Sequence, residues 1–134
     1  MLTGIMLLGA IVFGSGRADA ATLNVTGGCT LPIAIDSVNA GANQSGCTAT
    51  GAAYGTSDTI TIPAGTITLT ADLPTITEDV VIQGAGMTQT TISGDNGQRE
   101  IFDIGTSSPL NVTIEDLQIT GFRGFAIRSL NSNG

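Results

Sequence analysis

The sequence contains no histidine, no tryptophan and no lysine, so its four basic residues are all arginines. The lack of histidine excludes His-based catalytic triads and most zinc and copper sites. Eleven acidic residues against these four arginines give a formal net charge of −7, which argues against binding to nucleic acid or to anionic membranes. Apolar residues make up 41% of the chain, which is enough for a folded core. We therefore expect one acidic domain of 134 residues with no nucleic-acid partner.

An apolar run from Leu2 to Phe13 opens the chain. It is shorter than the roughly 20 residues that span a bilayer, and it is typical of the core of a signal peptide. Ala18-Asp19-Ala20 has the pattern of a cleavage site, although no basic residue precedes the run. We expect residues 1–20 to be a signal peptide and the mature, exported protein to begin at Ala21, without integration into the membrane. A buried N-terminal helix is the alternative, but four glycines within residues 4–16 disfavour it.

Cys29 and Cys47 are the only cysteines, and they enclose 17 residues. Two cysteines in an oxidising compartment usually pair. A metal site would lack further ligands, and a catalytic thiol would lack a basic partner. The sequence therefore predicts a Cys29–Cys47 disulfide, and it predicts neither a metal site nor a cofactor.

The segment from about Thr30 to Ala40 is expected to form the only helix of the mature chain. Thr30 is suited to the N-cap, Pro32 falls in the first turn, and Gly41 is suited to end the helix. Three apolar residues share one face at helical spacing and should cover the rest of the core: Leu31, Ile35 and Val38.

Short strands in which aliphatic residues alternate with threonines are expected elsewhere, first at 21–26 and then repeatedly from Ser57 onward. Most are three to five residues long, and several end in glycine. A β-sandwich and a parallel β-helix both accommodate such strands. The aromatic content of 4% and the dominance of isoleucine favour stacked aliphatic ladders, and with them the β-helix.

Cys29-Thr30-Leu31-Pro32-Ile33-Ala34-Ile35, followed by Asn39, resembles the signature that opens CSLREA-type exported bacterial proteins. The phrases Val81-Ile82-Gln83-Gly84 and Leu117-Gln118-Ile119-Thr120-Gly121 are also similar to that family. The resemblance implies an all-β fold, a right-handed parallel β-helix (a pectate-lyase-like solenoid) with one short N-terminal capping helix. It also implies a location outside the cell or on the bacterial cell surface. Pro32-Ile33 replaces the Arg-Glu pair of the family.

Members of that family are longer, and this sequence ends in mid-pattern at 131–134. We therefore expect residues 21–134 to be the N-terminal cap and first coils of a larger β-helix. The C-terminal edge is then expected to pair with further coils or to self-associate.

A polysaccharide-cleaving site would need clustered carboxylates. The candidates in this sequence are expected instead to be solvated, at corners between strands or, for Asp103, on the outward face of a strand. Arg99 is expected to form an ion pair with Asp103 or Glu100 at the surface.

The sequence thus predicts an exported cell-surface or secreted module with a structural or adhesive role, no catalytic residues, and carbohydrate or other surface ligands as partners. The alternative is the N-terminal part of a carbohydrate-active enzyme. Thr-x-Thr pairs suggest ice binding, but their spacing is irregular. The carboxylates considered are Glu78, Asp79, Asp95, Asp103, Glu115 and Asp116.

Overall fold

A computed structural model describes residues 20–97, 100–106 and 109–129. The expected signal peptide, apart from its last residue Ala20, lies outside the described residues, as do Arg99 and the last five residues of the sequence. The predictions made for those segments are therefore not addressed by the structure.

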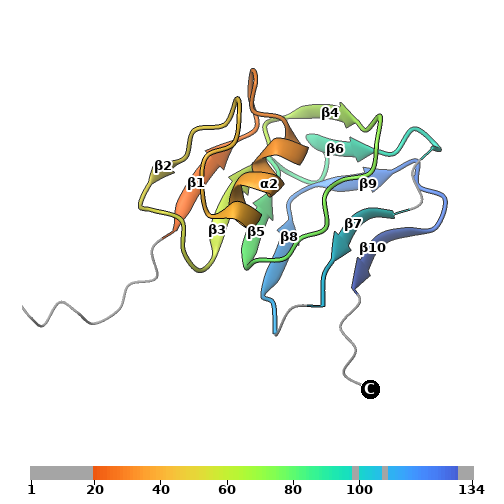
Figure 1. Cartoon of the computed structure of the whole chain (residues 1–134). Helices are drawn as coiled ribbons and strands as arrows, with labels where there is room; N and C mark the ends of the chain where they lie inside the picture. The colour runs from red at the N-terminus through yellow and green to blue at the C-terminus, as the bar shows by residue number, and fades with distance from the viewer. Residues whose placement is uncertain (1–19, 98–99, 107–108, 130–134) are drawn as a thin grey trace, which may run out of the picture.

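The strands form three small sheets, and nearly all neighbouring strands are parallel (Figure 1). The largest sheet has five strands in the order β2-β1-β3-β5-β8, namely Thr50–Gly51, Ala21–Asn24, Asp58–Thr61, Val80–Gln83 and Val112–Glu115. The second has three strands in the order β4-β6-β9, namely Gly65–Thr68, Thr90–Ser93 and Gln118–Thr120. The third pairs β7 with β10, namely Glu100–Ile104 with Phe125–Ser129. The pair β1–β2 is antiparallel.

The expected fold class, an all-β right-handed parallel β-helix with a capping helix, is wrong. The described chain has a mixed α/β fold, and its small sheets are not stacked as the coils of a β-helix. The sheets have five, three and two strands, and the first of them begins with an antiparallel pair. The helix contributes to the same hydrophobic core as the strands. The alternation of side chains predicted the strands, but it carries no information on how sheets are arranged around a helix.

The helix α2 spans Leu31–Ala40, as the sequence predicts. Pro32 lies in its first turn, and Gly41 ends it in a left-handed conformation with a φ of 62°. Thr30 occupies the N-cap position but makes no side-chain capping hydrogen bond. Five residues of the helix are buried: Leu31, Ala34, Ile35, Ser37 and Val38.

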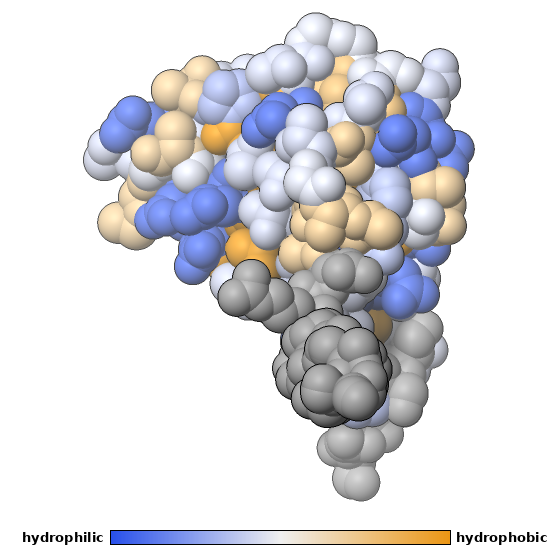
Figure 2. Space-filling view, turned by 90° about the vertical axis from the view of Figure 1, so that its left-hand side faces the viewer, coloured by the Kyte–Doolittle hydropathy of each residue, from blue (hydrophilic) through white to orange (hydrophobic). Residues whose placement is uncertain are grey.

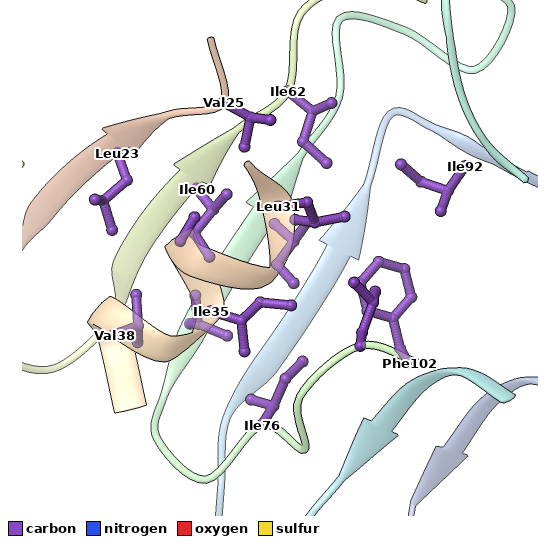
Figure 3. Close-up of a cluster of buried hydrophobic side chains, with 14 of the residues drawn as sticks. Leu23, Val25, Leu31, Ile35, Val38, Ile60, Ile62, Ile76, Ile92 and Phe102 are labelled. Atoms are coloured by element: carbon purple, nitrogen blue, oxygen red, sulfur yellow. The ribbon is translucent and has the colours of Figure 1, made fainter. Parts of the chain in front are cut away.

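The core is built from aliphatic side chains that lie opposite one another on neighbouring strands. Leu23, Ile60 and Ile82 face each other across β1, β3 and β5, and all three are fully buried. Figure 3 shows α2 lying over these strands, with Leu31 and Ile35 directed into the cluster that also holds Phe102. The helix and the sheets thus share one continuous core.

Candidate functional site

A groove of about 480 Å³ lies between β4 and the segment that leads into α2. This volume is within the range of small-ligand sites. Its lining is mainly apolar, with threonine hydroxyls at the rim and Asp72 as the only charged residue. The residues that line it include Val25, Thr26, Leu31, Ile67 and Thr68.

One wall of the groove is an edge strand. The N–H of Gly65 donates to the carbonyl oxygen of Gln89 at 2.8 Å, and the N–H of Leu69 donates to that of Ser93 at 2.8 Å. In a parallel ladder alternate residues bond to the same neighbour, so the main-chain groups of Thr66 and Thr68 point away from β6. This wall therefore offers hydrogen-bonding groups at the spacing of an extended polymer.

The opposite wall runs from Val25 to Pro32 and is fixed by the disulfide. Cys29 and Cys47 are bonded to each other, as the sequence predicts, and both are buried. The N–H of Cys29 also donates to the carbonyl oxygen of Thr26 at 3.0 Å. Pro32 also lines the groove on this side, and none of the lining residues on this wall is charged. The groove is suited to a neutral extended chain rather than to an anion.

Asp103 has two described side-chain partners, and the predicted partner Arg99 is not among the residues that the structure describes. Arg128 of β10 donates from Nε to Asp103 Oδ1 at 3.1 Å. Arg128 also lies 3.6 Å from Glu100, and Thr75 Oγ1 donates to Asp103 Oδ2 at 2.9 Å. The hydrogen bond from Arg128, with that from Thr75, holds the pKa of Asp103 below its usual value. These contacts tie β10 to β7.

The other predicted carboxylates are dispersed. Asp79 accepts hydrogen bonds from the N–H and the side-chain amide of Asn111 at 2.8 and 3.2 Å. Asp95 and Asp116 occupy turns with φ values of 51° and 55°, while Glu78 and Glu115 are exposed. Within the described residues, no group of three or more acidic or cysteine side chains could hold a metal ion.

Two polar residues form hydrogen bonds to distant parts of the chain that the sequence did not predict. Asn39 of α2 donates from Nδ2 to the carbonyl oxygen of Thr75 at 2.8 Å, and its Oδ1 accepts from the N–H of Thr77 at 2.9 Å. Asp58, at the start of β3, is 1% exposed and accepts a hydrogen bond from the N–H of Ala21 at 2.8 Å. A polar residue at the start of an alternating run was the only sequence signal for Asp58.

Tyr54 lies beside Asp58 and belongs to the same loop. Its hydroxyl donates to Asn43 Oδ1 at 2.8 Å, and that oxygen also accepts from the N–H of Ala49 at 2.9 Å. Burial, with a smaller contribution from the charge of Asp58, raises the pKa of Tyr54. These bonds order the loop that follows the disulfide, and they give Tyr54 a structural role.

Comparison with known proteins adds no relative: no protein-family model, no curated protein and no solved structure matches the chain. None of the described segments forms a helix with the length and apolarity of a membrane crossing. The geometry of the site is therefore the basis for a functional conclusion.

Proposed function

We propose that this chain is an exported module, secreted or held at a bacterial cell surface, with a structural or adhesive role and no catalytic site of its own. The observation that carries the proposal is the buried Cys29–Cys47 disulfide. Such bonds persist in oxidising compartments and are rare in the cytosol of mesophiles. The apolar run and the A-x-A pattern that precede Ala21 support the same location.

The resemblance to CSLREA-type proteins supports export as well. Three of the features that carry this resemblance have defined roles in the structure. Cys29 forms the disulfide, α2 follows it directly, and Asn39 connects the helix to Thr75 and Thr77. The relationship itself is part of the proposal.

Contacts of the carboxylates favour a non-catalytic role. Asp58 bonds to a backbone amide of β1, Asp79 bonds to Asn111, and Asp103 bonds to Arg128. A glycoside-cleaving pair needs two carboxyl groups that face a shared substrate space. Each of these three instead holds a different part of the fold together.

The adhesive part of the proposal is assigned to the groove beside β4. Its exposed threonines and its free strand edge would bind a neutral extended polymer, either a polysaccharide or an unfolded peptide segment, through hydrogen bonds along its length. Seen from the side on which β1 and β2 lie, the surface is a mosaic of hydrophilic and hydrophobic residues without a continuous apolar field (Figure 2). A groove with directional hydrogen-bonding groups therefore accounts for adhesion better than a broad apolar patch on that side.

The structural part of the proposal concerns the open end of the sheets, formed by β8, β9 and β10. Each of these is an edge strand in the described fold. Phe102 of β7 is fully buried, whereas its partner Ile127 on β10 is 44% exposed and Phe125 is 61% exposed. Exposed apolar side chains beside free strand edges are a template for pairing with another chain. We infer self-association of the chain through this open end.

Cell fractionation of a bacterial host that expresses the full chain tests export. The wild type and a Leu7→Ile control should leave the cytoplasm, whereas Leu7→Arg, which interrupts the apolar run, should remain inside with both cysteines reduced. Retention of the wild type in the cytoplasm would contradict the proposal.

Binding of the purified protein to immobilised polysaccharides and to unfolded peptides tests the groove. Thr68→Arg places a charged side chain in the groove from an exposed position, and Thr56→Arg is the matched control on an exposed loop outside it. We expect the wild type to bind without cleaving any bond, and we expect only Thr68→Arg to lose this binding. Cleavage products, or equal binding by the two variants, would refute this part of the proposal.

A further inference from the structure

Asp58 is a buried carboxylate whose position is set by the first residue of β1. Its Oδ1 accepts a hydrogen bond from the N–H of Ala21 at 2.8 Å and another from that of Gly55 at 3.1 Å. Asp58 is 1% exposed and Ala21 is fully buried. Ala21 is also the residue at which β1 pairs with β2, opposite Gly51. The carboxylate therefore lies at the point where the largest sheet begins.

The described contacts of Asp58 supply hydrogen-bond donors but no positive charge. Its carboxylate partners are backbone N–H groups. The two arginines in the described part of the chain lie elsewhere: Arg128 bonds to Asp103, and Arg123 bonds to the carbonyl oxygen of Asn96. A buried ionised carboxylate is costly unless a countercharge accompanies its hydrogen bonds.

The expected cleavage site lies at the atom that bonds to this carboxylate. When a peptidase adds water across the Ala20–Ala21 bond, Ala20 leaves with a new carboxylate and the nitrogen of Ala21 becomes a free amine. At neutral pH that amine takes up a proton and carries a positive charge, since α-amino groups titrate at about pH 7.7–8.0. The N–H that already bonds to Asp58 thus becomes part of an ammonium group.

We propose that removal of the signal peptide creates a buried ion pair between the new amino terminus at Ala21 and Asp58, so that processing supplies the countercharge that is missing from the described contacts of Asp58. This inference rests on the export and cleavage in the proposed function. The hydrogen bond becomes charge-assisted at both ends, and such bonds are stronger than neutral ones. Because Ala21 starts a strand that pairs with both β2 and β3, the ion pair would fasten this end of the largest sheet.

The absence of lysine makes the ion pair directly measurable. In the processed protein the amino group of Ala21 is the only amine, so an amine-reactive reagent reports on that group alone. N-terminal sequencing of the exported protein comes first and establishes that the chain begins at Ala21. The labelling rate is then measured for the folded protein and for the same protein in denaturant.

We expect folded wild-type protein to be labelled at least about tenfold more slowly than denatured protein, the factor that corresponds to one pKa unit for an amine. Asp58→Asn keeps an acceptor oxygen but removes the charge, and it should bring the folded rate close to the denatured one. Asp36→Asn, at an exposed position of α2, should leave the slow rate unchanged.

A second variant guards against misfolding of Asp58→Asn. One glycine inserted after Ala20, with cleavage before it, moves the amino group away from an unaltered Asp58 and should restore fast labelling in a folded protein. Fast labelling of the wild type that begins at Ala21 would overturn the ion pair and leave export intact. An exported product that begins elsewhere would also overturn the ion pair and leave export intact, whereas retention of the wild type in the cytoplasm would contradict the proposed function.

Discussion

Removal of the disulfide should cost this protein a large part of its stability. The bond joins residues 18 apart in the sequence. The chain-entropy relation for a loop of this length gives about 3 kcal/mol at 25 °C, because the cross-link restricts the unfolded chain. Folded domains of this size are stable by only about 5–15 kcal/mol, so the loss is substantial. We therefore expect Cys29→Ala/Cys47→Ala to lower the melting temperature by about 10–20 °C.

Thermal and urea unfolding of the exported protein measure this cost. The double variant also loses two buried sulfur atoms, so wild-type protein unfolded in the presence of a reductant is the matched reference for the bond itself. Reduced wild type and the double variant should have similar stability, and both should be about 3 kcal/mol less stable than oxidised wild type. The reductant should not affect the double variant.

The expected stabilisation comes from restriction of the unfolded chain rather than from contacts in the folded one. Ordinary surface substitutions change the free energy of unfolding by less than about 0.5 kcal/mol. If the free energies of unfolding of oxidised wild type and the double variant differed by no more than that, the cross-link would not stabilise the fold by restricting the unfolded chain. If the double variant lost much stability but reduction of the wild type had no effect, the packing of the sulfur atoms rather than the cross-link would stabilise the fold.

Three further predictions concern other parts of the fold. Asn39→Ala should cost about 1–3 kcal/mol in urea unfolding, because it removes both side-chain hydrogen bonds to the backbone at Thr75 and Thr77, whereas Asp36→Ala on the exposed face of α2 should cost little. The pKa of Asp103 is lowered chiefly by Arg128, so this pair stabilises the protein above about pH 4, and its contribution is lost as the pH falls through the lowered pKa. Arg128→Gln should therefore be less stable than wild type at neutral pH, and equal stability of the two proteins there would refute the assignment. Light scattering should show self-association of the wild type that Ile127→Lys abolishes. Met87→Lys, at a 70% exposed position between β5 and β6, should leave the self-association intact. A wild-type monomer at about 100 µM would contradict the open end as an association surface.

Local patterns predicted the elements of this structure well. The helix was identified because Thr30, Pro32 and Gly41 mark its ends and the apolar residues between them follow helical spacing. The disulfide followed from the number of cysteines and the expected compartment. Most strands were identified from alternation, although Thr75–Thr77 contributes only a single bridge, between Ile76 and Ile104.

The same local patterns did not predict which residues far apart in the sequence contact each other. The pairing of β1 with the two-residue strand β2 depends on a loop closed by the disulfide, and alternation alone does not reveal it. Arg128 and Asp103 are 25 residues apart, and Asp58 and Ala21 are 37 apart. The arrangement of the sheets, on which the β-helix prediction failed, depends on such contacts between distant residues. The groove beside β4 was missed for the same reason, since its two walls come from separate parts of the chain.

Mass spectrometry of the protein recovered from outside the cytoplasm tests the central claim, that the chain is an exported and disulfide-bonded module. The full chain is expressed in a bacterial host, and the exported fraction is analysed without reduction. We expect a product that begins at Ala21 and in which Cys29 and Cys47 are bonded to each other. A folded product that is confined to the cytoplasm, retains Met1 and carries two free thiols would contradict the account.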